Sequence, residues 1–135
     1  MSSIIELDHQ IIPELPFTWR MALTQGSTGV VASPSEGQSD NIVQLAKDLI
    51  PIIKLIGTCT VNSWLRTPLH NASVGGAPHS AHLLGAAVDL HPVQRTVAEC
   101  KDLIKGQSGH RLLYFEINTT NWLHLDFLHD HDFIA

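Results

Sequence analysis

The strongest constraint on the fold lies near the C-terminal end, where two stretches, residues 111–117 and 122–128, alternate between apolar and polar residues. We interpret residues 119–121 as a three-residue loop, because Asn121 tolerates the left-handed backbone that such a loop needs. Every residue on one face of the resulting hairpin is apolar: Leu113, Phe115, Ile117, Leu123, Leu125 and Phe127. A one-residue slip would mix the faces, so the pattern predicts a β-hairpin with one face in a core.

The other face of this hairpin carries side chains that can do chemistry. The predicted register places three pairs on it: Asn118 with Trp122, Glu116 with His124, and Tyr114 with Asp126. Two carboxylates, a histidine, a tyrosine and a tryptophan on one face are typical either of a solvated surface or of a functional site.

Two helices are predicted to cover the apolar face of the sheet. Apolar residues recur at helical spacing over residues 40–56, with Ser39 as the N-cap and Pro51 as an expected kink. The segment Thr96-Val97-Ala98-Glu99 has the form of a capping box and opens a second helix, over residues 96–105.

Two further strands are predicted between the helices. Residues 59–66 alternate, with Cys59, Val61, Ser63 and Leu65 on the core face and Thr60, Asn62, Trp64 and Arg66 on the polar face. Residues 86–90 form a short strand that points Val88 and Leu90 into the core and Asp89 the opposite way. The predicted class is therefore α+β, an antiparallel sheet packed on helices.

Composition limits the classes of function. The 135 residues predict a single domain, 1–135, with a mostly irregular lead-in over 1–38 and a tail over 129–135. Eight Lys and Arg and a net charge of −5 argue against nucleic-acid binding. No apolar run is long enough for a membrane span, and the start has no features of a signal peptide. We expect a monomer with two buried free thiols, Cys59 and Cys100.

Histidine is unusually frequent, with nine residues against eight Lys and Arg together. His82 precedes a turn of small residues, and Asp89 follows seven residues later with its side chain off the core face. Adding His124 from the hairpin gives two imidazoles and a carboxylate, the layout of a catalytic site for one divalent ion such as zinc. The alternative is a surface histidine and a turn aspartate with no shared role.

The motifs around these residues carry a family resemblance. The run Ser80-x-His82-x-x-Gly85-x-Ala87-x-Asp89 resembles the signature of the zinc D-Ala-D-Ala carboxypeptidases, a family that includes D,D-dipeptidases of vancomycin resistance and phage L-Ala-D-Glu endolysins. The preceding Ser63-x-x-Arg66-x-Pro68-x-x-Asn71-x-x-Val74-Gly75-Gly76 and the closing Trp122-x-His124 are similar to one branch of it, and Phe17-Thr18-Trp19 also matches. The resemblance spans Phe17 to Phe127 and implies the hedgehog-like fold of these peptidases.

The resemblance implies a role for each matching residue. His82, Asp89 and His124 become the zinc ligands. Arg66 matches the arginine that contacts the substrate carbonyl, and Ser80 and Trp122 match positions that contact the substrate. For Ser80, a helix cap is an equal alternative.

The general base is less clearly defined. Many relatives have an acidic residue three positions before the last histidine ligand, but this chain has Asn121 there. The branch with the closest motifs has a glutamate on the preceding strand, which matches Glu116. The predicted register independently places Glu116 opposite His124. Asp126 is the second candidate for the base, or it orients a histidine ligand.

The implied function is a zinc peptidase that hydrolyses an amide bond next to a D-amino acid in a peptidoglycan peptide, either as a carboxypeptidase or as an endolysin-type endopeptidase. The alternative is a catalytically weak or inactive zinc-binding module of the same fold, such as a phage structural or wall-docking protein. Without a signal peptide, we expect either a cytoplasmic protein or a phage-encoded protein that is released at lysis.

Overall fold

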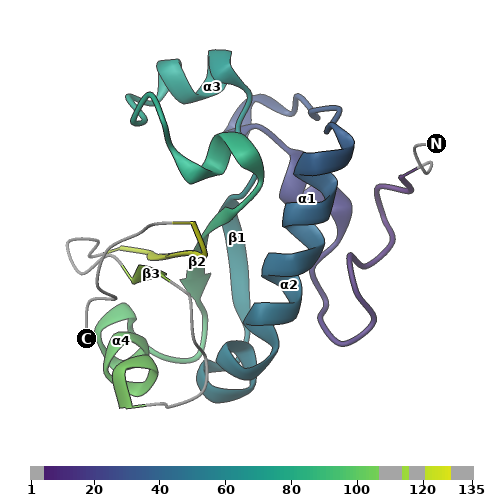
Figure 1. Cartoon of the computed structure of the whole chain (residues 1–135). Helices are drawn as coiled ribbons and strands as arrows, with labels where there is room; N and C mark the ends of the chain where they lie inside the picture. The colour runs from purple at the N-terminus through teal and green to yellow at the C-terminus, as the bar shows by residue number, and fades with distance from the viewer. Residues whose placement is uncertain (1–4, 107–113, 116–120, 129–135) are drawn as a thin grey trace.

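A computed structural model describes residues 5–106, 114–115 and 121–128 of the chain, and its architecture is α+β (Figure 1). Four strands form one antiparallel sheet in the order β1-β2-β4-β3. Their bounds are β1 Cys59–Ser63, β2 Ala87–Pro92, β3 Tyr114–Phe115 and β4 Leu123–Asp126. The predicted fold class is confirmed.

Helices pack against the sheet. The α-helices are α1 Trp19–Leu23, α2 Glu36–Ile56, α3 Pro68–Ser73 and α4 Val97–Gly106, and two 3-10 helices are η1 Gly26–Thr28 and η2 Ala81–Leu84. Figure 1 shows α2 running beside β1, with α4 near one end of the sheet. Buried apolar side chains of α2, α4, β2 and β4 form one core: Ile42, Leu45, Leu49, Ile52, Ile56, Cys100, Ile104, Val88, Leu90, Leu123 and Leu125.

Helix α2 begins four residues earlier than the sequence predicts. Ser35, not Ser39, is the N-cap: its hydroxyl accepts the backbone N–H of Gln38, and the Gln38 side chain accepts the N–H of Ser35. This reciprocal pair is a capping box that the nearby Gly37 concealed, since a glycine beside serines resembles a loop. The expected lead-in over 1–38 thus contains α1, η1 and the start of α2.

Strand β1 ends before the predicted boundary. The pairing with β2 shifts between Val61 and Ser63, and the strand stops at Ser63. Trp64, expected on the polar face, is completely buried and meets the Phe17 ring edge-on at 6.2 Å between centroids. The interrupted alternation turns Trp64 into the core while Arg66 still reaches the polar side.

The closing hairpin has the predicted register where it is described. Tyr114 pairs with Asp126, and Phe115 pairs with Leu125. Glu116 lies outside the described residues, as does most of the expected loop. The capping box at α4 is also confirmed, because the side chains and backbone N–H groups of Thr96 and Glu99 bond reciprocally at 2.8 and 3.1 Å.

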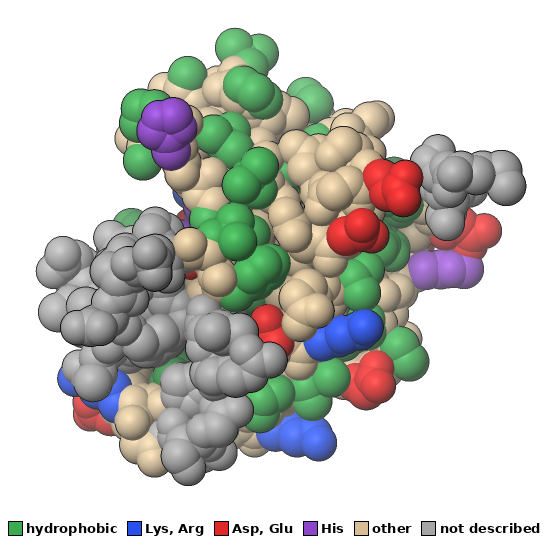
Figure 2. Space-filling view, in the orientation of Figure 1, with side chains coloured by type: hydrophobic (Ala, Val, Ile, Leu, Met, Phe, Trp, Pro, Cys, Tyr) green, Lys and Arg blue, Asp and Glu red, His purple; other side chains and the backbone are tan. Residues whose placement is uncertain are grey.

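The surface of the described residues shows no concentration of positive charge on the face in Figure 2, where Lys and Arg side chains are separated from one another and interspersed with Asp and Glu. Within the described part of the chain, no helix has the length and apolar character that crossing a bilayer requires.

Candidate metal centre

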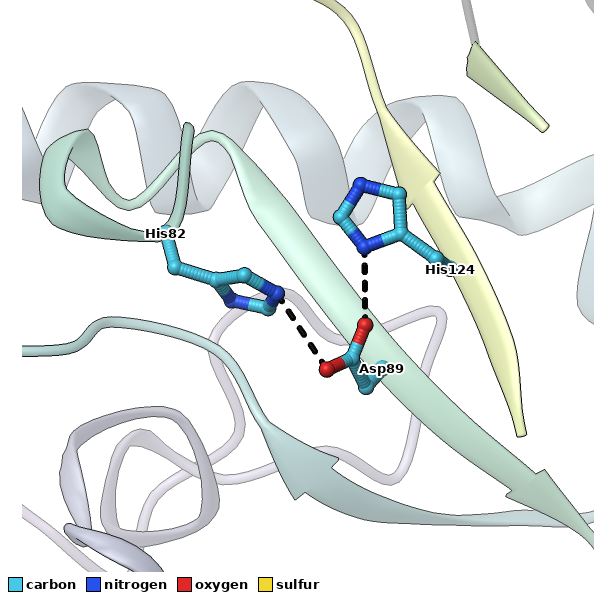
Figure 3. A group of neighbouring side chains, drawn as sticks. All are labelled: His82, Asp89 and His124. Atoms are coloured by element: carbon cyan, nitrogen blue, oxygen red, sulfur yellow. Dashed lines mark hydrogen bonds and ion pairs between the residues drawn. The ribbon is translucent and has the colours of Figure 1, made fainter. Parts of the chain in front are cut away.

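Three different elements bring His82, Asp89 and His124 together (Figure 3). His82 lies in η2, Asp89 in the middle of β2, and His124 on β4 directly opposite Asp89. One nitrogen or oxygen from each side chain lies within 4.8 Å of the other two, and all three residues are buried. The polar face of the sheet therefore holds a compact cluster of two imidazoles and one carboxylate.

The His82 ring is oriented by the backbone of a neighbouring segment. Its Nδ1 lies 2.7 Å from the carbonyl oxygen of Trp64, so Nδ1 carries the proton and donates it there. The opposite nitrogen, Nε2, is buried and lies 3.3 Å from Asp89 Oδ2, yet it makes no hydrogen bond with any described residue. A buried imidazole nitrogen with its lone pair directed into a cluster is a group that needs a partner.

The His124 ring lies between two carboxylates. Its Nδ1 is 2.9 Å from Asp89 Oδ1, and its Nε2 is 2.8 Å from Asp126 Oδ2. Asp126 has no exposed surface, and its second oxygen accepts the backbone N–H of Leu128 at 3.1 Å. Asp126 thus fixes the ring so that Nδ1 faces Asp89 and His82.

The charges of the cluster reinforce one another. Burial alone would raise the pKa of Asp89, but its hydrogen bond with His124 acts in the opposite direction, and that pKa lies well below the usual range. Burial alone would lower the pKa of His124, but hydrogen bonds to Asp126 and Asp89 raise it to about 9. His124 is therefore protonated at neutral pH when only protein groups surround it.

The cluster fits a divalent transition metal. In a tetrahedral zinc site the bonds are about 2.0–2.2 Å, so neighbouring ligand atoms lie roughly 3.4 Å apart. In the cluster, His82 Nε2 lies 3.3 Å from one oxygen of Asp89, His124 Nδ1 lies 2.9 Å from the other, and one ligand atom of each residue lies within 4.8 Å of the other two, so small side-chain shifts would bring them to that spacing. Two imidazole nitrogens and one carboxylate are also the donor types that zinc prefers, and each histidine has its other nitrogen bonded to a backbone or carboxylate oxygen.

Arg66 borders the cluster and is itself firmly held. Its guanidinium donates to Ser63 Oγ at 3.1 Å, to Asn71 Oδ1 at 3.2 Å and to Asp89 Oδ2 at 3.3 Å. Burial lowers the pKa of Arg66, partly offset by Asp89, but an arginine stays charged at any physiological pH. Three of its five N–H groups are used in these contacts, so the others can serve a bound molecule.

Asn71 ties Arg66 to the loop that follows α3. Its side-chain NH₂ donates to the carbonyl of Ala77 at 2.9 Å while its oxygen accepts from Arg66. Gly76 packs against this pair so closely that a Cβ there would overlap Asn71 Oδ1 and lie 3.0 Å from Arg66 Nη1. These contacts explain the motif that runs from Asn71 to Gly76. They position the Arg66 side chain and the loop beside it, which lines a cleft.

The cleft opens over the cluster and has a volume of about 610 Å³. It is lined by the cluster and by residues from the loop and from the start of β4: Arg66, Val74, Gly75, Gly76, Ala77, Pro78, His79, Ser80, His82, Asp89, Trp122 and His124. Trp122 is 37% exposed there. Ser80 is the N-cap of η2, its hydroxyl accepting the N–H of His82 at 3.2 Å, so it both caps the helix and borders the cleft.

The other predicted site residues divide into two groups. Arg66, Ser80, Trp122 and the three cluster residues line one cleft, and Asp126 is buried behind His124. Glu116 lies outside the described residues. Asn121 is exposed, and its carbonyl lies 3.2 Å from His91 Nδ1.

Sequence reasoning missed two positioning groups, the carbonyl of Trp64 and the side chain of Asn71. A backbone carbonyl leaves no signal in a sequence. Asn71, by contrast, lies inside the motif that carries the family resemblance, so its presence in that pattern was a usable signal.

Comparison with protein families places this fold and cluster in a known class. Residues 16–126 match the family described as Peptidase M15. The chain belongs to the Peptidase M15 family, the D-Ala-D-Ala carboxypeptidase-like zinc peptidases, whose fold is hedgehog-like. No curated protein gave a significant match to the chain.

Proposed function

We propose that this protein is a zinc-dependent peptidase that hydrolyses an amide bond next to a D-amino acid in peptidoglycan peptides. The observation that carries the proposal is the buried cluster of His82, Asp89 and His124 at the base of an open cleft. Membership of the Peptidase M15 family supports the reaction class and the choice of zinc. The substrate follows from the family resemblance rather than from the shape of the cleft.

In this proposal His82 Nε2, a carboxylate oxygen of Asp89 and His124 Nδ1 hold the ion. Zinc bound there supplies a Lewis acid and lowers the pKa of a water molecule. Because His124 is protonated in the protein alone, its Nδ1 must release a proton before it can act as a ligand. Asp126 and the Trp64 carbonyl keep the two rings in the orientation that ligation requires.

Two side chains of the protein then act on the substrate: Arg66 binds its carbonyl oxygen, and Glu116 transfers the proton. Arg66 donates N–H groups to the carbonyl oxygen of the scissile amide and stabilises the negative charge that develops there. Glu116 removes a proton from the attacking water, and the oxygen of that water forms the new bond to the carbonyl carbon. Glu116 passes the same proton to the leaving amine as the C–N bond breaks, so that the base is regenerated.

We prefer Glu116 to Asp126 as the base for two reasons. Asp126 is fully buried, and its two oxygens accept from His124 Nε2 and from the Leu128 N–H, on the far side of the ring from Asp89. The described pairs of the hairpin, Tyr114 with Asp126 and Phe115 with Leu125, are those of the register that would place Glu116 opposite His124.

Defined muropeptides test the proposal directly. The purified protein is loaded with zinc, incubated with muropeptides of known peptide composition, and the products are identified by mass spectrometry. We expect one bond next to a D-amino acid to be cleaved, a chelator to abolish cleavage, and zinc to restore it. The mass of the products tells a carboxypeptidase from an endopeptidase. A zinc-loaded protein that releases no amine from any muropeptide contradicts the proposal.

A second candidate function is a zinc-binding module without peptidase activity, such as a phage structural or wall-docking protein. The observation that favours it is Asn121, which stands where many relatives have an acidic residue and which cannot accept a proton. This candidate predicts that the zinc-loaded protein sediments with purified peptidoglycan but leaves its peptides intact.

A further inference from the structure

His82 lies in a turn in which each backbone carbonyl of residues 82–85 accepts a hydrogen bond from a residue outside the turn. Four donors from two other segments, α2 and the residues that follow β1, reach it: the Arg66 N–H to His82 O at 2.9 Å, Gln38 Nε2 to Leu83 O at 3.0 Å, Asn41 Nδ2 to Leu84 O at 2.9 Å, and Trp64 Nε1 to Gly85 O at 3.1 Å. Carbonyls at the end of a short helix normally face water, so four protein donors mark this turn as unusually well fixed.

Two of the four donors, Gln38 and Asn41, belong to the first turns of α2. Gln38 is also the capping-box residue of α2, and its Oε1 accepts the N–H of Ser35 at 2.8 Å. One end of its amide therefore faces an N–H and the other a C=O, which determines the orientation of the amide. Asn41 follows three residues later on the same side of the helix.

The turn also packs directly against the backbone of α2. Gly85 has a φ of +74°, and a Cβ at this position would lie 2.8 Å from the carbonyl oxygen of Gln38. The close approach and the left-handed backbone both require glycine there. The His82 ring itself has Trp64 O as its only hydrogen-bond partner among the described residues, so its position also depends on how the backbone of the turn is held.

We propose that Gln38 and Asn41 are positioning residues for the metal centre: they hold the η2 turn so that His82 Nε2 points at Asp89 and His124. The inference rests on the proposed function, because it requires that the cluster binds zinc. Neither residue lines the cleft or lies in the motifs that carry the family resemblance. Their effect is on the ligand geometry and not on the substrate.

Matched variants separate this role from helix capping. Gln38→Glu keeps an oxygen that accepts the Ser35 N–H and adds a negative charge that the helix N-terminus favours, but it replaces the donor to Leu83 O with an acceptor. Asn41→Asp makes the same exchange opposite Leu84 O. Ser35→Ala is the control, since it removes the cap from the Gln38 N–H and leaves the amide of Gln38 intact.

Three measurements are made on each variant of the full chain. They are the thermal unfolding midpoint of the metal-free protein, the zinc affinity from competition with a chromogenic chelator, and the visible spectrum of the Co²⁺-loaded protein. We expect Gln38→Glu and Asn41→Asp to bind zinc about tenfold more weakly, with an altered Co²⁺ spectrum. Gln38→Glu should keep the unfolding midpoint of the wild type. Ser35→Ala should unfold at a lower temperature but keep the zinc affinity and the Co²⁺ spectrum.

Two results would overturn the inference. One is wild-type zinc affinity and an unchanged Co²⁺ spectrum in both Gln38→Glu and Asn41→Asp. The other is an equal loss of zinc affinity in Ser35→Ala, which would make helix stability the cause. A wild-type protein that binds no zinc would instead contradict the proposed function and remove the basis of the inference with it, so the two failures are distinguishable.

Discussion

Asp126 accepts the Nε2 proton of His124 at 2.8 Å from a position with no exposed surface. The carboxylate lies two residues along the same strand, so β4 supplies both a candidate ligand and the group that orients it. A carboxylate behind a histidine ligand fixes the ring and makes its other nitrogen a stronger donor to a metal. The contact therefore explains why an acidic residue is buried here, beside a cluster that already contains Asp89.

Asp126→Asn tests this role. An asparagine of the same shape keeps an oxygen that can accept from Nε2, but it loses the charge, so we expect zinc affinity to fall about 10- to 100-fold. At zinc concentrations high enough to fill the weakened site, most of the peptidase activity should return. Competition with a chelator and activity at saturating zinc measure the two effects. An Asp126→Asn protein with normal zinc affinity and no activity would identify Asp126 as the base instead.

If Glu116 is the general base, Glu116→Gln should lose activity but keep its zinc, whereas Asp126→Asn should lose zinc affinity but regain activity at saturating zinc. The amide cannot accept the proton of the attacking water, so we expect hydrolysis to fall about 10²- to 10⁴-fold. Zinc content, measured by elemental analysis, should stay at the wild-type value because Glu116 is not a ligand in this proposal. Full turnover by this variant would exclude Glu116 as the base.

Gly76→Ala is expected to impair catalysis without removing the metal. The new methyl group would overlap Asn71 Oδ1 and crowd Arg66 Nη1, so both side chains must move. Because a shift of about 1 Å in a substrate-orienting group can cost up to 10²-fold in rate, we expect kcat/KM to fall at least tenfold with zinc affinity unchanged.

Gly75→Ala is the matched control for that variant. Gly75 has a φ of +71°, so alanine strains the backbone there, but its Cβ would meet no atom within 4 Å. We expect Gly75→Ala to lower the unfolding midpoint and to keep more activity than Gly76→Ala. Equal activity in the two variants would contradict the role given to the contact of Gly76 with Asn71.

The sequence predicted those features of the fold that depend on local periodicity. The alternation of residues 123–127 predicted both the register with Tyr114 and Phe115 and the burial of Leu123 and Leu125. The capping box of Thr96 and Glu99 was equally visible, because all its partners lie within four residues. In the same way, the two-residue period of a strand was enough to predict that the side chain of Asp89 lies on the other face of the strand from those of Val88 and Leu90.

The features that the sequence did not reveal depend on contacts between distant segments. Trp64 was misplaced because pairing with β2 shifts just before it, and nothing in residues 59–66 marks that shift. The bond from Gln38 to Leu83 joins residues 45 positions apart. The bond from His82 to the Trp64 carbonyl uses a backbone atom that every residue has. Such contacts determine ligand orientation, so the identity of the candidate ligands was predictable and their geometry was not.

Because of Cys59, the free energy of unfolding should decrease as the pH rises in the alkaline range. Burial, and to a smaller extent the neighbouring Cys100, raise the pKa of its thiol from 9.0 to about 12. Between these values the folded protein keeps the proton while the unfolded chain loses it, so the stabilising contribution is complete below about pH 9 and is lost as the pH rises toward about 12. Cys59→Ser removes this group with little change in size.

The measurement is the free energy of unfolding of wild type and Cys59→Ser at several values from about pH 7 to about pH 11. We expect the difference between the two proteins at neutral pH to shrink steadily above about pH 9. A difference that stays constant over this range would show that the thiol titrates normally in the folded protein.

Zinc should stabilise the folded protein, because only the folded chain brings His82, Asp89 and His124 together. At a free zinc concentration about 100 times the Kd, the added stability is about 2.7 kcal/mol, which corresponds to a rise in Tm of roughly 10 °C for a domain of this size. Removal of the ion with a chelator should return the Tm to its starting value.

Two controls make the zinc effect specific to this site. His82→Ala deletes a proposed ligand whose buried Nε2 lacks a hydrogen-bond partner among the described residues, so the zinc-dependent rise in Tm should disappear in this variant. Mg²⁺ should give no rise in the wild type, because it prefers oxygen ligands and binds imidazole poorly. If zinc raises the Tm of His82→Ala as much as that of the wild type, the ion is bound elsewhere, and the assignment of this cluster as the metal centre is wrong.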